Sequence, residues 1–259
     1  MLTIEDIHVR YGKNPVLQGV SASGFQPGSI TGLLGPNAAG KSTLVKTIAG
    51  IQRASSGTCR ITSNGEELSG SNRRDAIGYV PQDLLSSASL TAFESILVAT
   101  KRSTRRAATA TAQEQAAAVL ERLGITHLAS RYVHELSGGQ RQLVAVGQML
   151  VREPEVLLLD EPTSALDLRH QVELLQLIRR EVSQKDSIAL IAIHDLNLAA
   201  RYCDQLIVLH RGRLMAQGQP SEVLTPGLLE EVYGLRAKVL DDAGTPVICP
   251  VEESAPSHL

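Results

Sequence analysis

The chain has 259 residues, 43% of them hydrophobic and 20% charged, which is the composition of a folded globular protein with room for one large domain or two modest lobes. Its 25 basic and 27 acidic residues give a formal net charge of −2, which excludes an overall basic field for nucleic acid and leaves room only for a local basic patch. The N-terminus lacks the basic start and apolar stretch of a signal peptide, and no apolar run approaches the roughly 18 residues of a membrane span, so we expect any role at a membrane to depend on a partner.

The first part of the chain is predicted to be mostly β structure around one helix. Apolar residues alternate with polar ones over 2–11, which indicates a strand with a slip near Asp6. Further strands are predicted at 16–22, 29–34, 58–62 and 77–80, and a helix at 43–49.

From residue 90 the pattern becomes helical. The segments 91–100 and 111–123 are rich in alanine with helical spacing, and no further strand pattern occurs before Val156, so we interpret this region as a helical insertion. The basic run at 101–106 admits two interpretations, a binding patch or a solvated connection, and its place between two helices favours the connection.

After Val156 strands and helices alternate again. Strands are predicted at 156–159, 188–193 and 206–209, and helices at 169–182 and 196–202. The first two of these strands are apolar on both faces, as central parallel strands covered by helices are. Beyond residue 212 we expect a short hairpin, two short helical pieces around 221–232 and a polar tail whose last eight or so residues fray. The three cysteines, Cys59, Cys203 and Cys249, are far apart and without metal-type spacing, so we expect buried, reduced thiols of a cytosolic protein.

A phosphate-binding loop is predicted between the strand at 29–34 and the helix at 43–49. Its spacing, G-x-x-x-x-G-K-S, suits a turn in which glycines wrap the backbone around a nucleotide's phosphates and the next helix adds the positive end of its dipole. Lys41 is expected to reach the β- and γ-phosphates, and Ser42 to offer its hydroxyl to a magnesium ion. The plain alternative is a glycine-rich turn before an ordinary helix. The predicted nucleotide-binding residues here are Gly35, Pro36, Asn37, Ala38, Ala39, Gly40, Lys41, Ser42 and Thr43.

A second feature is a pair of carboxylates at the end of the apolar strand at 156–159. If this strand lies beside the strand that precedes the phosphate loop, Asp160 reaches the magnesium shell through water, and Glu161 reaches the water that attacks the γ-phosphate. Acidic residues are common in turns, so the pair indicates a site for ATP hydrolysis only in combination with the phosphate loop.

A third feature stands at the start of a helical run that continues to about residue 152. Its residues are Leu136, Ser137, Gly138, Gly139 and Gln140. Ser137 is a natural N-cap, and the paired glycines expose backbone N–H groups at the positive end of the helix, which makes a second anion site. One nucleotide needs one cradle, so two cradles suggest two nucleotides between two chains that face each other. The alternative is a glycine-rich cap on a structural helix.

Taken together in this order, the three motifs resemble those of the nucleotide-binding subunits of ATP-binding cassette (ABC) transporters, and the resemblance covers nearly the whole chain. It implies an α/β fold: a P-loop NTPase cassette with a RecA-like mixed sheet core, an N-terminal antiparallel β subdomain and an inserted α-helical subdomain. A single ABC ATPase domain would then span 1–259, with 1–83 and 154–235 as catalytic core and β subdomain, 84–153 as helical signature subdomain and 236–259 as a short C-terminal extension.

The resemblance also implies roles for residues outside the three motifs. Tyr11 matches the aromatic that stacks on adenine, where the alternative is a buried sheet tyrosine. Gln82 matches the glutamine that touches magnesium and the attacking water, and His194 matches the histidine that contacts the γ-phosphate. The implied catalytic residues are Glu161, His194 and Gln82, and the implied Mg²⁺ ligands are Ser42, Gln82 and Asp160. The loop of Ser164, Ala165, Leu166 and Asp167 matches the one that crosses the dimer interface, although Asp167 would also suit a helix N-terminus.

One position departs from the family pattern, because Ala38 stands where glycine is more common. If the loop needs a positive φ there, alanine raises the energy of the loop by about 1–2 kcal/mol. We expect ATP binding to tolerate this.

The function implied by the resemblance is ATP hydrolysis that drives transport. ATP and Mg²⁺ would lie between the Lys41 loop of one subunit and the Ser137 loop of a second copy, and the helical insertion with the Gln82 loop would pass the closing motion to integral membrane permease subunits. The stretches 189–218 and 225–234 look like those of importers of iron–siderophore complexes, haem or cobalamin, which work with a separate substrate-binding protein. The subunit would then lie at the cytoplasmic face of the inner membrane as a peripheral protein.

Four alternatives belong to other classes: an ABC ATPase of another transporter, a soluble cassette ATPase acting on DNA, a ribosome-associated cassette factor, and a regulatory protein with dead sites. The segment between Gly40 and Ser137 shows no sustained heptads of the coiled coil that a DNA-acting ATPase would carry. Every motif occurs once, whereas the ribosomal factors carry two cassettes, and no residue required for hydrolysis is missing. We therefore expect no nucleic-acid partner.

Overall fold

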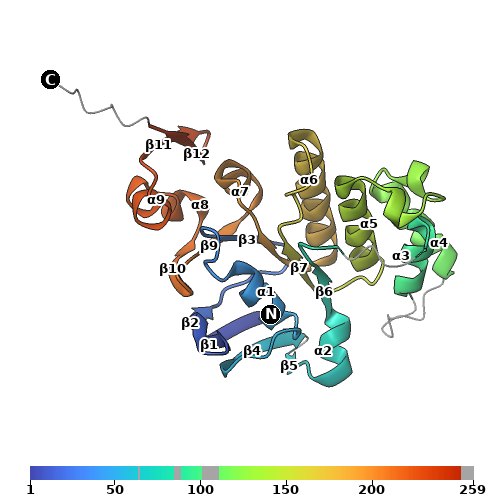
Figure 1. The fold of residues 1–259 in the computed structure, drawn as a ribbon, viewed down its shortest axis with the longest axis horizontal. Coiled ribbons are helices and arrows are strands. Elements are labelled where there is room, and N and C mark those ends of the chain that lie inside the picture. Colours follow the sequence, from blue (N-terminus) through green and yellow to red (C-terminus); the bar gives the residue numbers. More distant parts are fainter. Residues whose placement is uncertain (64, 85–88, 101–110, 252–259) are drawn as a thin grey trace.

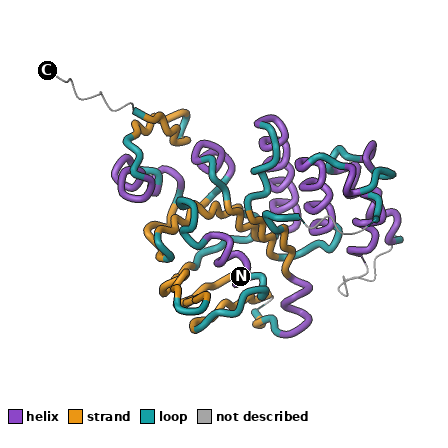
Figure 2. Tube along the Cα trace, in the orientation of Figure 1, coloured by secondary structure: helices purple, strands orange, loops and turns teal. Residues whose placement is uncertain are grey.

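Two β sheets and the helices packed on them form most of the structure, a computed structural model that describes residues 1–63, 65–84, 89–100 and 111–251. Figure 1 shows the larger sheet in the middle of the molecule, the smaller sheet below it, one group of helices at the right end and the C-terminal elements at the left end. Figure 2 shows that strands fill the centre and that helices flank the larger sheet above and to one side.

The smaller sheet is antiparallel, with strands in the order β2-β1-β4-β5. Its strands are β1 (Leu2–Tyr11), β2 (Asn14–Ala22), β4 (Ser56–Ser63) and β5 (Glu66–Glu67). The predicted slip in β1 is confirmed: Asp6 has a φ of 49°, and the register with β2 shifts between Ile4 and Ile7. This irregularity keeps the apolar residues on both sides of it buried on one face.

The larger sheet has its strands in the order β10-β9-β3-β8-β7-β6. They are β3 (Ile30–Leu34), β6 (Ile77–Val80), β7 (Val156–Asp160), β8 (Ile188–Ala192), β9 (Gln205–His210) and β10 (Arg213–Gly218), and only β10 runs antiparallel to its neighbour. Every residue of β3, β7 and β8 is buried, because the sheet is covered on both faces. The loops that follow β3, β6, β7 and β8 therefore meet at the edge where these parallel strands end.

Helix α1 (Lys41–Ile48) lies between the two sheets (Figure 1) and shares one hydrophobic cluster with both. The other face of the larger sheet is covered by α6 (Leu168–Lys185), α7 (Leu196–Tyr202), α8 (Pro220–Val223) and α9 (Pro226–Tyr233), which share a second cluster with it. Neighbouring residues of one strand serve different clusters, since Leu33 belongs to the first and Leu34 to the second. Burial of such side chains, worth roughly 1.5–3 kcal/mol each, holds the layers together.

The helices between β6 and β7 have a small core of their own. They are α3 (Ala92–Thr100), α4 (Ala112–Arg122), α5 (Gly138–Leu150) and two 3-10 turns, η1 (Thr126–Leu128) and η2 (Val133–Glu135). Helix α4 begins at a capping box formed by Thr111 and Glu114. Helix α5 contributes to two hydrophobic clusters. Val144 belongs to this small core, and Val146 belongs to the cluster that α6 to α9 share with the larger sheet. We call α3, α4, η1 and η2 together the helical part.

Several elements lie where the sequence pattern indicates none or something else. Helix α2 (Gly70–Ala76) and β5 are short and polar, and only Ala76 of α2 is buried, so no apolar pattern marks them. The expected short hairpin is formed by β9 and β10, which pair antiparallel on either side of residues 211–212, and the two expected helical pieces are α8 and α9. A second hairpin, of β11 (Ala237–Asp242) and β12 (Thr245–Pro250), lies in the stretch predicted as a polar tail, so that prediction is wrong. It is anchored by the buried Ile248, whose backbone N–H donates to the Asn197 side chain at 2.8 Å.

Three further expectations concern the termini, the basic run and the cysteines. The run at 101–106 and the last eight residues lie outside the described residues. The three thiols are free as expected, but only Cys203 is buried, whereas Cys59 and Cys249 are partly exposed, so the expectation of three buried thiols is wrong. None of the described helices is both long enough and apolar enough to cross a membrane.

Candidate nucleotide site

The predicted phosphate loop connects β3 to α1, and its backbone conformation requires glycine at its first position. Gly35 has a φ of 145°, and a Cβ atom there would lie 2.2 Å from the carbonyl oxygen of Leu209 in β9. Gly40, with a φ of 105°, is the N-cap of α1. Ala38 has a φ of 62°, so this position does adopt the left-handed conformation that favours glycine.

Lys41, the first residue of α1, points back into the loop. Its Nζ donates to the carbonyl oxygens of Gly35 at 2.7 Å and Pro36 at 3.2 Å. Burial lowers the pKa of the Lys41 ammonium below its ordinary value, and the nearby carboxylates of Glu161 and Asp160 act in the opposite direction. The loop thus holds a desolvated cation whose partners are neutral carbonyl groups, an arrangement that favours exchange of those carbonyl groups for phosphate oxygens.

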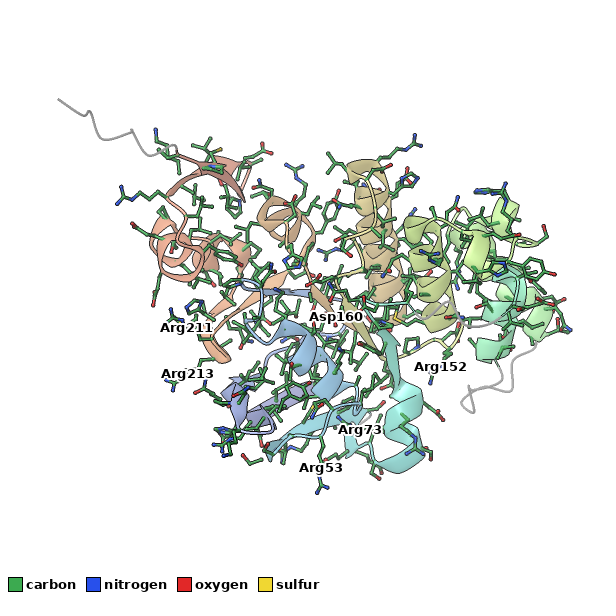
Figure 3. All side chains as sticks on the ribbon, in the orientation of Figure 1. Arg53, Arg73, Arg152, Asp160, Arg211 and Arg213 are labelled. Carbon is green, nitrogen blue, oxygen red and sulfur yellow. The ribbon has the colours of Figure 1, made fainter. Side chains whose placement is uncertain are left out.

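Asp160, at the end of β7, is the acidic neighbour of the loop, and Figure 3 labels it near the centre of the molecule. Its Oδ1 accepts a hydrogen bond from Ser42 Oγ at 2.9 Å, while its buried Oδ2 has no hydrogen-bond partner among the described residues. Burial raises the pKa of Asp160, and the hydrogen bond from Ser42 opposes that shift. A buried carboxylate oxygen without a partner is unfavourable unless a cation compensates it.

This pair of oxygen donors fits a magnesium ion, which prefers hard oxygen ligands and is usually bound through one or two carboxylates plus phosphate and water. Within the described ranges, no group of three or more His, Cys, Asp or Glu side chains is placed to hold a metal ion. Gln82, the third predicted ligand, makes no hydrogen bond to Asp160 or Ser42 in the described part of the chain, and its amide is engaged by Glu161 instead.

Glu161 contacts both of the other predicted catalytic residues, Gln82 and His194. Its Oε2 accepts a hydrogen bond from Gln82 Nε2 at 2.6 Å, and its Oε1 lies 2.6 Å from His194 Nε2. The Glu161 side chain is only 10% exposed, and its backbone has a φ of 54°. The three residues follow β7, β6 and β8, and the parallel register of these strands brings them to one edge of the sheet.

Tyr11 lies at the end of β1, and its side chain is 49% exposed. The interpretation as a buried sheet tyrosine is therefore wrong. An exposed aromatic at a hairpin end, before Gly12 with its φ of 62°, offers a flat face for a base.

The Ser137 motif caps α5 as predicted. Gln140 donates its backbone N–H to Ser137 Oγ at 3.3 Å, and the Gln140 side chain accepts from the Ser137 N–H at 3.1 Å, which is a capping box. Among the described residues, no hydrogen bond or ion pair joins 136–140 to the phosphate loop. The structure therefore does not bring the phosphate loop and the Ser137 motif of one chain together.

The Ser137 motif instead packs against the loop of residues 164–167. A Cβ atom on Gly139 would lie 2.7 Å from Leu166 Cδ2, and one on Gly138 would lie 3.5 Å from Ala165 Cβ. Asp167 is the N-cap of α6 and accepts from the His170 N–H at 2.9 Å, so the electrostatic role considered for it is present.

Two residues that support the site were not predicted. Gln171 in α6 donates from its side chain to the carbonyl oxygens of Thr163 and Leu166, which fixes the loop after Glu161. Tyr233, at the end of α9, forms a hydrogen bond with the backbone of Gly35; burial raises its pKa to about 12, and that hydrogen bond opposes the shift. Both contacts join distant segments, so no local pattern signals them.

Comparison with known proteins agrees with this geometry. Residues 17–164 match the ABC transporter family. The chain is 36% identical to the ferric enterobactin transport ATP-binding protein FepC of Escherichia coli (strain K12), over 98% of this chain and 95% of that protein. It is 39% identical to the hemin import ATP-binding protein HmuV of Photobacterium damsela subsp. piscicida, over 92% of this chain and 91% of that protein. Among solved structures, a metal-chelate type ABC transporter in an inward-facing conformation matches with a TM-score of 0.79 and 26% identity, over 97% of this chain and 98% of that one. The chain therefore belongs to the ABC transporter family and is one of its ATP-binding, ATP-hydrolysing proteins.

Proposed function

We propose that this ATPase powers the import of an iron–siderophore complex, haem or a cobalamin-type compound through a transmembrane permease. The observation that carries the hydrolytic part is the position of Glu161, held by Gln82 and His194 at the sheet edge from which the phosphate loop also starts. The cargo class is supported by the similarity to the ferric enterobactin transport protein FepC and the hemin import protein HmuV, and by the similar structure of a metal-chelate type transporter.

In the proposed reaction, a water oxygen attacks the γ-phosphorus of ATP, the bond from that phosphorus to the bridging oxygen of ADP breaks, and the proton of the water passes to the Glu161 carboxylate. Lys41 binds the β- and γ-phosphates, and Tyr11 stacks on the adenine. Gln82 orients the attacking water, and His194 contacts the γ-phosphate, so both release Glu161 when the nucleotide arrives. A bound Mg²⁺, held by Ser42, Asp160 and Gln82, supplies charge compensation for the phosphate oxygens.

The proposed site is completed by a second copy of the chain. Ser137 is exposed, and among the described residues it makes no hydrogen bond with the phosphate loop of its own chain. The first-turn N–H groups of Gly138 and Gly139, which the capping box does not use, can therefore face a nucleotide held by another copy. Leu168, next to the loop of residues 164–167, is 65% exposed, as expected for an apolar side chain at an interface. We therefore assign residues 136–140 and 164–167 to the dimer interface.

A groove of about 600 Å³ between the helical part and the larger sheet is the proposed docking surface for the permease. Its wall includes Pro81 and Asp83, which flank Gln82 in the chain, together with Val98 of α3. Figure 3 labels Arg152, another residue of its wall, between the helices at the right and the smaller sheet. A permease segment bound there would touch the Gln82 loop and so couple its position to the state of Glu161.

The proposed import role also implies a location for the subunit and a further partner. The subunit would be peripheral at the cytoplasmic face of the inner membrane, and a substrate-binding protein would deliver the cargo to the permease on the other side. The alternative is an ABC ATPase of another transporter class, for another metal or a small solute. A soluble ABC ATPase that serves no transporter is the less favoured alternative.

The variant Glu161→Gln tests the hydrolytic role. It keeps the side-chain shape but removes the carboxylate, so we expect ATP binding to persist, turnover to fall by about 100-fold or more, and ATP-dependent dimers to accumulate. Glu231→Gln, which removes an exposed carboxylate from α9, is the matched control and should hydrolyse ATP like the original protein. Undiminished turnover by Glu161→Gln would remove Glu161 from the role of general base.

Copurification tests the transport role. The protein should copurify with an integral membrane subunit. Val98→Asp should abolish this while ATP affinity is retained, because it replaces an exposed apolar side chain of the groove with a charge that disfavours docking. The control is Met215→Asp, a comparable change on β10, outside the groove. The cargo is then identified by which binding protein and ligand stimulate ATP hydrolysis in the reconstituted complex.

A further inference from the structure

Arg122, the last residue of α4, and Glu181 in α6 form an ion pair between the helical part and the main body of the fold. Arg122 Nη1 lies 2.8 Å and 3.0 Å from the two carboxylate oxygens of Glu181. The Glu181 side chain is 5% exposed, whereas that of Arg122 is 36% exposed. Separating Arg122 from this buried carboxylate removes favourable charge compensation, so the pair favours one distance between the two helices.

Glu181 has a second cation, but this one comes from its own helix. Lys185 Nζ lies 3.2 Å from Glu181 and 3.4 Å from Glu153, which stands in the turn after α5. Lys185 therefore compensates Glu181 without reaching α4. Of these two cations, only Arg122 connects Glu181 to the helical part.

Beside the ion pair, the boundary between α4 and α6 is loosely packed. A cavity of about 360 Å³ separates the two sides, with Leu128 on the side of the helical part and Leu174 and Leu177 on the side of α6. Gln140, at the start of α5, lines the same cavity. By contrast, α5 is tightly packed on the helical part, since a Cβ atom on Gly147 would lie 2.8 Å from Ile96 Cδ1. The helical part and α5 can therefore tilt together relative to α6, which widens or narrows this cavity.

We infer that the Arg122–Glu181 ion pair sets the resting angle between the helical part and α6, and thereby positions the Ser137–Gln140 loop for the partner's nucleotide. A change in the width of the cavity moves Gln140, which forms the capping box with Ser137. Arg122 and Glu181 are positioning residues, because they act through α4, η1 and η2 on a loop that they do not touch. The inference rests on the proposed function only in assigning the partner's nucleotide to that loop.

The first test measures the angle in nucleotide-free protein. Spin labels are placed on exposed positions of α4 and α6 through Ala118→Cys and Gln176→Cys, in a variant that lacks the three native cysteines. Arg122→Gln should shift the mean distance between the labels by about 2 Å or broaden its distribution, because the ion pair between α4 and α6 is lost. Lys185→Gln, which also removes one cation from Glu181, should leave the distribution unchanged, and Arg122→Lys should restore it. An unchanged distribution in Arg122→Gln, or the same change in Lys185→Gln, would overturn the inference.

The second test measures the ATP concentration for half-maximal dimer formation in the Glu161→Gln variant. Adding Arg122→Gln should raise it by about 3- to 10-fold, whereas adding Lys185→Gln should change it less than about twofold. Binding of a fluorescent ATP analogue to monomers should be equal in all of them, because the phosphate loop is not involved. Urea unfolding of each variant, with Glu181→Gln as a second way to break the pair, separates repositioning from a general loss of structure. If no variant dimerises with ATP, the proposed function fails, while the distance measurement still decides whether the pair sets the angle.

Discussion

Lys41 donates a hydrogen bond to the carbonyl oxygen of Gly35, 2.7 Å away within the same loop. The hydrogen-bond acceptors of this buried ammonium are carbonyl oxygens, and negatively charged phosphate oxygens would compensate its charge better. Lys41→Met should therefore weaken ATP binding by about 10-fold or more, since it removes a charge-assisted hydrogen bond worth about 1.5–3 kcal/mol. Fluorescence titration measures this, with Lys238→Met, the same change on an exposed residue of β11, as control.

The same substitution should not destabilise the nucleotide-free protein. Because the pKa of Lys41 is lowered in the folded state, its charged form is less favourable there than in the unfolded chain, and Met removes this penalty. The penalty is fully present below the lowered pKa and disappears as the pH rises to the ordinary value of 10.5. Urea unfolding at neutral pH should show equal or greater stability for Lys41→Met, and a smaller difference at alkaline pH. A clear loss of stability at neutral pH would contradict this.

Ala38→Gly should change stability and ATP binding only slightly. The left-handed backbone of Ala38 costs about 1–2 kcal/mol, and glycine relieves it, but glycine also gives the unfolded chain about 0.5–1 kcal/mol more entropy to lose. Calorimetric titration with ATP should therefore show an affinity within tenfold of the original. A larger gain would mean that alanine impairs the cradle.

Ser137→Ala should separate the capping role of Ser137 from its role toward the partner's nucleotide. Thr225 is the matched control, because it caps α9 by accepting an N–H from Leu228 at 3.3 Å, the distance at which Ser137 accepts from Gln140. Loss of either cap should lower the free energy of unfolding by about 1 kcal/mol. Only Ser137→Ala should also raise the ATP concentration needed for dimers in the Glu161→Gln variant. Equal effects of both substitutions on dimer formation would reduce Ser137 to a structural cap.

The motifs that the sequence predicts well are local chemical patterns. The glycines and Lys41 of the phosphate loop, and the cap at Ser137, each depend on residues a few positions apart, so their local geometry follows from the sequence. Gln82 and His194 are single polar residues and could be assigned only through the family resemblance. Their common contact with Glu161 arises from the register of β6, β7 and β8, which no local pattern contains.

Contacts between distant segments could not be predicted from the pattern. Arg122 and Glu181 are 59 positions apart, and neither stands in a motif. Tyr233 reaches Gly35 only because α9 packs on the larger sheet. In the hairpin of β11 and β12 only Pro246 and Ile248 are buried, so no long apolar pattern marks its strands, and the two prolines of β12 disfavour a strand prediction.

The central claim is that each ATP lies between the phosphate loop of one copy and the Ser137 loop of another. Intermolecular cross-linking tests it most directly, with Asn37→Cys in one tagged copy and Ser137→Cys in a differently tagged copy, both lacking the native cysteines. Asn37 and Ser137 are exposed, so a disulfide requires only that the two loops approach, to a Cα separation of about 4.4–6.8 Å. With Mg²⁺ and a non-hydrolysable ATP analogue, mild oxidation should give a disulfide-linked dimer carrying both tags, and without nucleotide it should not. No linked dimer with the analogue, or equal amounts with and without it, would contradict the claim.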